Sequence, residues 1–247
     1  WEKREKLQAS TYGAEFLATC TGFGATHLQG LADTPERVEL IYHGLDLNRF
    51  PAPPKREYAG GPVKFISVGR AVEKKGFDRL IAALATLPAD LDWHWEHIGG
   101  GTLSDTLKRQ ARDAGIEACV TWRGACDQPE VIEAMRGADI FVLPSRIAED
   151  GDRDGLPNVL MEAASQKLVI LSTPVSAIPE FITDGIHGVL SADDPSSLAG
   201  ALRALSLNPE QRRDMAEAAY ERLTERFQMA PGIAQLDTRL RAMLAGA

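Results

Sequence analysis

Short apolar runs typical of strands alternate with helical patterns along this chain, and this alternation constrains the fold more than any other feature. The run VKFISVG leads into a helical pattern over 77–87, and the order repeats through LDWHWEHIG, CVTWRG, DIFVLPS and LVILST. Strands and helices at this rhythm predict an α/β fold, with a mostly parallel sheet covered by helices on both faces. Ligands bind beyond the carboxyl ends of strands in such sheets, so a site is expected in the loops that follow the strands.

The chain has 247 residues, a length that suits one large or two small domains. The stretch LDLNRFPAPPKREYAGG is rich in proline, glycine and charge, and is the best candidate for a linker. A shorter strand and helix series precedes it, and the amphipathic stretch GIAQLDTRLRAML closes the chain. We therefore expect a short leading region, a linker and one regular α/β domain.

Composition excludes several classes of protein. A net charge of -8 argues against a general nucleic-acid binder, which usually carries a basic face. Three cysteines without metal-like spacing fit reduced thiols in a cytosolic protein. No apolar run reaches the roughly 18 residues that a transmembrane helix requires. Since the sequence opens with WEKREKLQAS, without Met or a signal peptide, we expect it to be part of a longer protein.

The first candidate site is the loop SVGRAVEKKGFDRL. Arg70 follows a strand end, and Lys74 and Lys75 precede Gly76 just ahead of a helix. An Arg and a Lys beside a helix N-terminus can neutralise a diphosphate through charge-assisted hydrogen bonds. The alternative is a solvated surface loop with a glycine turn.

The second candidate is the glycine run in HIGGGTLSDTL. Gly99, Gly100 and Gly101 allow the backbone to approach a ligand closely, and a helix starts at once. The run is not G-x-G-x-x-G, and no acid follows at the nicotinamide spacing. A tight structural turn explains it equally well.

The third candidate is the acidic loop and helix in EDGDRDGLPNVLMEA. With a helix beginning near Pro157, Asp154 lies just ahead of its N-terminus and Glu162 about 7–8 Å along its axis. Two carboxylates at different depths, beside the free N–H groups of Gly155 and Leu156, suit the hydroxyls of a sugar and a ribose. The alternatives are a helix-dipole acid and an exposed helix residue. The remaining loop acids are expected to be solvated: Glu149, Asp150 and Asp152.

Other catalytic constellations are not evident. His94 and His97 lie on opposite faces of one strand, and each histidine is expected to be a satisfied structural residue. The tryptophans are expected to cover the sheet, and no metal-ligand spacing occurs. The sequence therefore predicts no metal and no cofactor.

The ordered series YHGLDLNRF, VGRAVEKKGFDRL, HIGGG, DIFVLPS, DGLPNVLMEA and LVILSTPVSAIPEFITDGIHGVL resembles the retaining glycosyltransferases of family four, which have the GT-B fold. The resemblance runs from about Glu15 to about Phe227, and it is closest to members that build bacterial exopolysaccharide or related surface glycans. It implies two Rossmann-like domains, of which most of the acceptor-side domain is missing here. It divides the chain into the tail of that domain (1–50), a linker (51–61), a nucleotide-sugar donor domain (62–228) and a C-terminal crossing helix (229–247).

The resemblance also implies roles for residues. Arg70 and Lys75 match the groups that grip the donor diphosphate, Asp154 the acid that contacts the transferred sugar, and Glu162 the acid that accepts ribose hydroxyls. The remaining substrate-binding candidates are backbone or base contacts: Gly99, Gly100, Arg123, Gly124, Gly155, Leu156 and Pro157. Asp154 departs from the family, which has Glu there; its shorter side chain can shift sugar preference or leave Asp152 to share the role.

The resulting hypothesis is the donor-binding part of a glycosyltransferase that moves a hexosyl group from a nucleotide-diphosphate sugar to an acceptor hydroxyl. The acceptor, a glycan or a lipid-linked sugar, is expected on the missing domain, which would also carry any membrane association of an otherwise cytoplasmic protein. The fragment alone is expected to bind donor weakly and not to turn over. The alternatives are a GT-B sugar-nucleotide epimerase and a catalytically silent nucleotide-sugar-binding module; a nicotinamide oxidoreductase is disfavoured because its fingerprint loop is absent.

Overall fold

The computed structural model describes residues 14–56 and 60–246, and the chain divides into two compact units. The larger unit comprises residues 50–223, and the smaller unit joins residues 1–49 to residues 224–247.

The larger unit is built on a six-stranded sheet in which every pair of neighbouring strands runs parallel. The strand order is β5-β4-β3-β6-β7-β8, so the direction of travel across the sheet reverses between β3 and β6. The strands are β3 (Val63–Val68), β4 (Trp93–Ile98), β5 (Val120–Gly124), β6 (Ile140–Leu143), β7 (Val169–Ser172) and β8 (Val189–Leu190). This arrangement confirms the predicted fold class, and the reversal creates a crevice at the carboxyl ends of β3 and β6.

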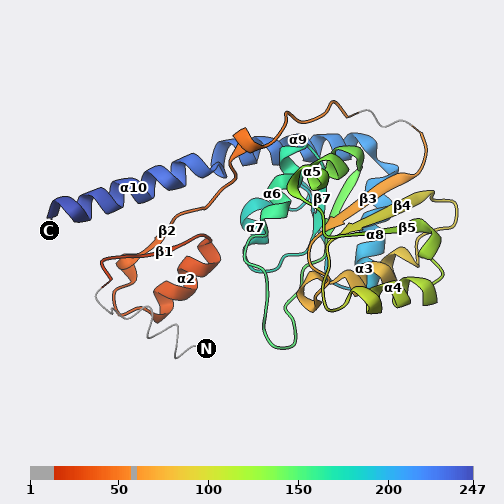
Figure 1. The fold of residues 1–247 in the computed structure, drawn as a ribbon, viewed down its shortest axis with the longest axis horizontal. Helices are drawn as coiled ribbons and strands as arrows, with labels where there is room; N and C mark the ends of the chain where they lie inside the picture. Colours follow the sequence, from red (N-terminus) through yellow and green to blue (C-terminus); the bar gives the residue numbers. More distant parts are fainter. Residues whose placement is uncertain (1–13, 57–59, 247) are drawn as a thin grey trace. The chain divides into compact units, whose positions relative to one another are not determined.

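Helices cover both faces of this sheet (Figure 1). Because βαβ crossovers are right-handed, α3 and α4 lie on one face, while α5, α6 and α7 follow the reversal onto the other. Helix α8 packs on α3, and α5 packs on β3 and α6. The helices are α3 (Phe77–Leu84), α4 (Ser104–Asp113), α5 (Gln128–Gly137), α6 (Asn158–Ser165), α7 (Ile178–Phe181), α8 (Pro195–Leu207) and α9 (Pro209–Arg226), with short 3₁₀ turns η3 (Glu73–Lys75) and η4 (Glu117–Cys119).

Burial explains why the central strands are easily recognised in the sequence. All residues of β6 and β7 are buried, because both faces of the central strands are covered, and these strands are continuous apolar runs.

Helix α5 starts with a capping box, in which the Asp127 side chain accepts from the backbone N–H of Glu130 and the Glu130 carboxylate accepts from the backbone N–H of Asp127.

Part of the predicted linker is anchored rather than loose. The Arg56 guanidinium donates to the carbonyl oxygens of Gln166 at 2.9 Å, Met135 at 3.1 Å and Ala138, at the ends of α5 and α6. Arg136 adds a bond to the carbonyl of Ala52 at 2.7 Å. Both arginines satisfy helix C-terminal carbonyls or the linker backbone, so residues 52–56 follow the α5–α6 side of the unit.

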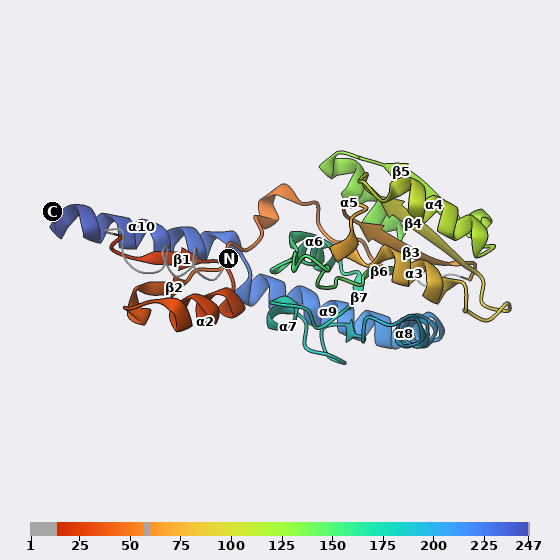
Figure 2. The same ribbon diagram turned by 90° about the horizontal axis from the view of Figure 1, so that it is seen from below.

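The smaller unit contains two parallel strands, β1 (Leu17–Thr19) and β2 (Val38–Leu40), which lie between α2 (Gly22–Leu31) and α10 (Met229–Gly246) (Figure 2). Turns η1 (Pro35–Arg37) and η2 (Leu47–Arg49) complete it. Helix α10 is tied to β2 by an ion pair of 2.9 Å between Arg239 and Glu39. Among the described residues, none of the helices combines the length and apolar character that a membrane crossing requires.

Candidate active site

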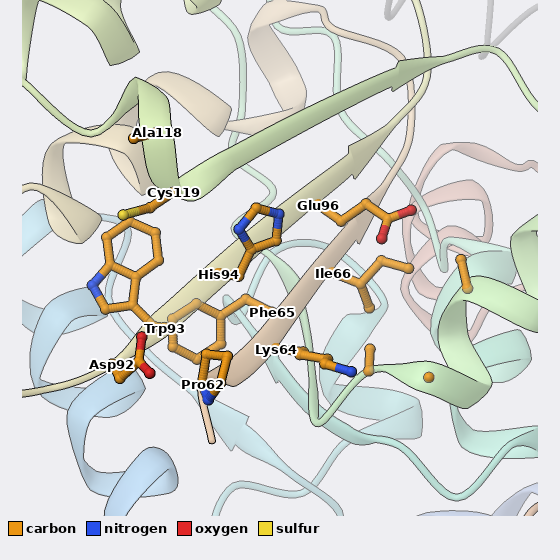
Figure 3. Close-up of a pocket in the computed structure, with 13 residues that line it drawn as sticks. Pro62, Lys64, Phe65, Ile66, Asp92, Trp93, His94, Glu96, Ala118 and Cys119 are labelled. Carbon is orange, nitrogen blue, oxygen red and sulfur yellow. The ribbon is translucent and has the colours of Figure 1, made fainter.

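Two cavities lie near opposite ends of β3, and the larger one has a volume of about 540 Å³ and lies toward the amino ends of β3 and β4 (Figure 3). Two of its polar side chains are paired across the sheet: His94 Nε2 lies 2.8 Å from Thr121 Oγ1, and Arg123 Nη1 lies 3.0 Å from Glu96 Oε1. The rest of its wall comes from the start of β3 and β4 and from small residues of η4 and of α5 with its C-cap, namely Ala118, Cys119, Ala134, Gly137 and Ala138. This cavity shows no cluster of converging charges among its lining residues.

The smaller cavity, of about 440 Å³, lies at the carboxyl end of β3, where the strand order reverses. It is formed by the end of β3, the lysine turn η3 and the loop and first turns of α6, with lining residues Val68, Gly69, Arg70, Lys74, Lys75, Asp154, Leu156, Pro157, Asn158, Val159 and Glu162. Six of the predicted site residues therefore meet in one place: Arg70, Lys75, Asp154, Leu156, Pro157 and Glu162.

A close backbone approach positions the lysine turn. Gly76 has a φ of 65°, and a Cβ at this position would lie 2.0 Å from the carbonyl oxygen of Pro144 at the end of β6. The turn is also held by a hydrogen bond of 2.8 Å from the Arg146 backbone N–H to the Lys74 carbonyl. Glycine is therefore required here by both conformation and space, and it brings the lysines beside the acidic loop.

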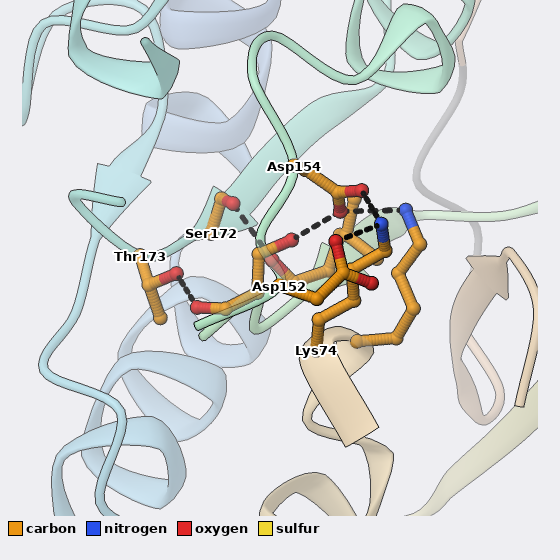
Figure 4. A network of polar contacts seen from close by, with 8 residues as sticks. Lys74, Asp152, Asp154, Ser172 and Thr173 are labelled. Atoms are coloured by element: carbon orange, nitrogen blue, oxygen red, sulfur yellow. Dashed lines mark hydrogen bonds and ion pairs between the residues drawn. The ribbon is translucent and has the colours of Figure 1, made fainter. Parts of the chain in front are cut away.

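The lysines and acids form one polar network (Figure 4). Lys75 Nζ lies 2.7 Å from Asp154 Oδ2, which also accepts a hydrogen bond of 3.2 Å from the Ser145 hydroxyl. Lys74 Nζ lies 3.0 Å from Asp152 Oδ1 and 3.6 Å from Asp154 Oδ1. The side chains of Lys74, Lys75 and Asp154 are only 11–13% exposed, so their charges interact more strongly than surface charges do.

Asp152 differs from the acids that line the cavity. Its side chain is 55% exposed, and the hydrogen bond from Lys74 is the main cause that lowers the pKa of its carboxyl group. Its sequence context predicts a solvated loop acid, with a share in the sugar-binding role as an alternative. Asp152 is exposed, but it is also the partner of a cavity lysine, and no motif indicates this pairing.

The charge of the cavity favours an anion. Three cations and two carboxylates line it, Arg70, Lys74 and Lys75 against Asp154 and Glu162, which leaves one net positive charge in a chain of net charge -8. The Arg70 side chain is exposed and makes no hydrogen bond or ion pair within the described part of the chain, although its charge contributes to the lowered pKa of Asp152. Its guanidinium is therefore available to an anionic ligand.

Helix α6 contributes its first turn and an acid one turn deeper. Asn158 and Glu162 are four residues apart, so they project from the same helical face, and both line the cavity. Pro157, expected in the first turn, is instead the cap residue with extended backbone (φ −64°, ψ 123°), and the helix begins at Asn158. The positive end of the helix dipole therefore reaches the cavity wall.

The other predicted contacts do not line this cavity. Gly99 has a structural reason, because a Cβ there would lie 2.0 Å from the Gly69 carbonyl oxygen, and its N–H donates to the Gly124 carbonyl at 2.7 Å. Arg123 is paired with Glu96, and the Gly155 carbonyl accepts from the backbone of Ala177 at 3.4 Å. The ligand roles of these residues and of Gly100 stay predictions.

Several residues of the site were missed from the sequence. Lys74 stands beside Lys75 in EKKG, but only one of the two matched the family motif. Ser145 carries no motif of its own and becomes visible only through its bond to Asp154. Asn158 and Val159 are recognisable as the first turn of α6, yet their sequence does not indicate which face they present.

A buried histidine packs against the first residue of α3, two residues after the lysine turn. His97 is 1% exposed and packs against Phe77, the first residue of α3, with ring centroids 4.6 Å apart. Burial lowers its pKa from 6.5 to about 4, and a weak interaction with the backbone of Gly69 opposes this only in part. Neither ring nitrogen has a partner in hydrogen-bond geometry among the described residues, so the hydrogen-bond partner expected for His97 is not found, while its burial agrees with the expected structural role.

Comparison with known proteins agrees with this geometry. A family profile described as "Glycosyl transferases group 1" matches residues 49–222. The chain belongs to this family. The six-stranded unit is its group 1 glycosyltransferase domain. The lysine turn and both acids of the cavity lie inside the matched region.

Two similar bacterial proteins are named as biosynthesis glycosyltransferases. The chain is 35% identical to amylovoran biosynthesis glycosyltransferase AmsK of Erwinia amylovora over 173 residues, covering 69% of this chain and 42% of AmsK. It is 29% identical to the putative colanic acid biosynthesis glycosyltransferase WcaL of Salmonella typhimurium, covering 82% of this chain and 50% of WcaL. The chain thus spans half or less of the length of these relatives.

Solved structures share the fold. Sucrose-phosphate synthase from Thermosynechococcus elongatus superposes with a TM-score of 0.84 at 20% identity, covering 100% of this chain and 62% of that chain. The Anabaena protein HepE in complex with UDP-glucose superposes with a TM-score of 0.81 at 17% identity, covering 98% and 68%. At these identities the similarity establishes the GT-B type of fold.

Proposed function

We propose that this chain is the donor-binding part of a retaining glycosyltransferase of family four, and that the whole protein transfers a hexosyl group from a nucleotide-diphosphate sugar to an acceptor hydroxyl. The observation that carries this proposal is the cavity at the carboxyl end of β3, where an excess positive charge lies beside two carboxylates at different depths. A nucleotide sugar presents the matching groups in the same order: sugar hydroxyls, diphosphate and ribose hydroxyls. The names of the polysaccharide-synthesising relatives support the same assignment.

In this proposal the diphosphate binds Arg70, Lys75 and the first turn of α6. Arg70 offers a planar fork of donors, Lys75 a partly buried ammonium, and the helix its N-terminal dipole. The deeper acid, Glu162, then accepts the ribose hydroxyls. Asp154, beside Lys75, accepts a hydroxyl of the transferred sugar.

These groups also supply the chemistry of the leaving group. When the glycosyl bond breaks, negative charge develops on the departing nucleotide diphosphate. Preorganised cations and a helix N-terminus stabilise such charge most strongly where water is scarce. Arg70, Lys75 and α6 therefore take the role that a divalent metal plays in other transferases, and the reaction is proposed to proceed without one.

We further propose that residues 62–228 form the donor domain, residues 1–50 the tail of the acceptor-side domain, 51–61 the linker and 229–247 the crossing helix. The acceptor, a glycan or lipid-linked sugar, would bind the part of the relatives' length that this chain does not cover. Any peripheral association with the inner face of a membrane would depend on that part as well.

Titration calorimetry with UDP- and GDP-sugars tests the donor assignment. Replacing Arg70 by Ala should weaken binding by about tenfold or more, because a charge-assisted contact to the diphosphate is lost. A matched variant, Lys64→Ala, removes an exposed cation from the larger cavity and should bind like the wild type. Equal binding by the Arg70 variant and the wild type would overturn the diphosphate role.

One observation favours a silent nucleotide-sugar-binding module as a second candidate. The sugar-side acid is Asp154 where the family has Glu, and its carboxylate is already engaged by Lys75. Glycosyl transfer by the full-length protein decides between the two. Transfer that disappears in the Asp154→Ala or Glu162→Ala protein supports an enzyme, whereas donor binding without transfer in the wild type supports the module.

A further inference from the structure

Asp154, the acid proposed to bind the sugar, forms an ion pair with Lys75, the cation proposed to bind the diphosphate. Asp154 Oδ2 lies 2.7 Å from Lys75 Nζ, the shortest of its three polar contacts with side chains. Both side chains are nearly buried, at 13% and 11% exposure. The Asp154 carboxylate therefore neutralises the same ammonium that an anionic ligand of this cavity would contact.

A diphosphate and Asp154 compete for the same ammonium. Bringing diphosphate oxygens to Lys75 either breaks the ion pair or places a third charge beside it, and the two anions repel each other in a poorly solvated site. A carboxylate that loses its partner without replacement remains desolvated, which is costly. The competition therefore weakens any diphosphate that offers Asp154 nothing in return.

A nucleotide sugar offers a replacement that a bare nucleotide does not. Its sugar hydroxyls can donate to Asp154 when Lys75 turns to the phosphates, so the carboxylate keeps a full set of hydrogen bonds. We propose that Asp154 is a competing counter-ion that makes the site prefer the sugar-bearing nucleotide over the bare nucleotide diphosphate. This inference rests on the proposed function and adds a means of product release, since the nucleotide left after transfer again competes with Asp154.

Lys74 limits, but does not remove, the cost of separating Asp154 from Lys75. Its ammonium lies between two carboxylates, 3.0 Å from Asp152 and 3.6 Å from Asp154. Asp152 is 55% exposed and is solvated if Lys74 moves toward Asp154. Because Lys74 already interacts with Asp154, it replaces the shorter contact with Lys75 only in part. Lys74 also lines the cavity, and the part of its effect that differs between the two ligands acts through Asp154.

The decisive experiment is calorimetry on Asp154→Asn, which removes the charge and preserves the size of the side chain. We expect the variant to bind UDP or GDP, whichever the wild type binds, about threefold to tenfold more tightly. It should bind the corresponding nucleotide sugar more weakly, because an amide is a poorer acceptor for a hydroxyl than a carboxylate. Opposite signs for the two ligands distinguish the exchange from a general change in the site.

Two controls separate the ion pair from the overall field. Glu149→Gln removes one charge from the same exposed loop and should change both affinities by less than about twofold, because exposed charges are screened. In a Lys75→Met background, Asp154→Asn should no longer tighten UDP or GDP binding, because the pair is already broken. A persisting gain there would overturn the proposed route through Lys75.

The outcomes distinguish this inference from the proposed function. A wild-type protein that binds neither ligand contradicts the proposed function itself. Wild-type binding combined with an Asp154→Asn variant that weakens both ligands, or tightens both equally, contradicts only the counter-ion role. Should thermal melting show that this variant is unfolded, Lys74→Met decides: it should weaken the bare nucleotide more than the nucleotide sugar, and equal losses would refute the inference.

Discussion

The two cavities at opposite ends of β3 differ in the charges that line them. This difference follows from the direction of the strands and not from the size of the cavities. The larger cavity, of about 540 Å³, opens toward the amino ends of β3 and β4, and the smaller one, of about 440 Å³, lies at the carboxyl end of β3. In a parallel sheet only the carboxyl edge collects the following loops and the N-termini of helices. The smaller cavity accordingly gathers three cations, two acids and the start of α6.

The two cavities also differ in the sequence separation of their paired charges. In the larger cavity, Glu96 pairs with Arg123 of the adjacent strand β5, as cross-strand neighbours do on any sheet surface. In the smaller cavity, Lys75 and Asp154 are 79 residues apart and meet only because β3 and β6 are neighbours. A long-range pair of nearly buried charges is costly to build, which favours a functional interpretation.

The largest expected effect compares the glycine that ends the lysine turn with a glycine that lines the larger cavity. Gly76→Ala should lower the free energy of unfolding by about 2–4 kcal/mol, because alanine is strained at φ 65° and its Cβ would overlap Pro144. Gly137→Ala, at the end of α5 beside the larger cavity, has open space around its Cβ and should be neutral or stabilising. Urea denaturation measures both. Equal stability of the two variants would show that the lysine turn does not depend on close packing.

The next effect concerns the support of that turn and depends on pH. The pKa of His97 is lowered to about 4 by burial, so the native state disfavours its protonation. The stability that neutral His97 contributes is complete above its unfolded pKa of 6.5 and is lost as the pH falls toward 4. Between pH 7 and pH 4.5, we expect His97→Leu to lose about 2–3 kcal/mol less than the wild type in denaturation experiments.

A neighbour on the same strand serves as the control for this titration. His94 points to the larger cavity, and His94→Gln should retain the wild-type pH dependence because His97 is intact. An identical pH dependence for His97→Leu and the wild type would show that His97 does not titrate in this range.

The smallest effect compares one acid from each cavity. Glu162→Ala should weaken the binding of a nucleotide sugar by about tenfold, because the ribose hydroxyls lose a charged acceptor. Glu96→Ala, in the larger cavity, should leave it unchanged within about twofold. Calorimetry with the same donor measures both. If only the Glu96 variant bound the donor more weakly, the donor site would lie in the larger cavity instead.

Much of the fold could be predicted because its signals are local. Strand-like runs such as VKFISVG and DIFVLPS are apolar because their strands lie between two layers of helices, and each matches an observed strand. Element ends were less certain, as Pro157 shows: its ring suits both a first helical turn and the residue before it. Among the candidate residues, the prediction was strongest where spacing on one helix sufficed, as for Glu162 in α6.

Residues whose role depends on a distant partner could not be assigned in this way. Gly99 was predicted to approach a ligand, but the structure packs it against the Gly69 backbone of the neighbouring loop. Lys74 was expected in the candidate anion-binding loop and Asp152 among the solvated acids, but their pairing follows from the placement of two loops. No pattern within either segment encodes such contacts.

The sequence by itself determined the alternation of strands and helices, the loops that end them and the place of Glu162 within α6, since periodicity and turn chemistry act over a few residues. The tertiary structure alone decided which loops meet. The reversal of strand order between β3 and β6 brings Lys75 to Asp154, whereas Arg123 pairs with Glu96 of the neighbouring strand β4. Strand order is a property of packing across the whole domain, and the ion pair at the centre of the site is its consequence.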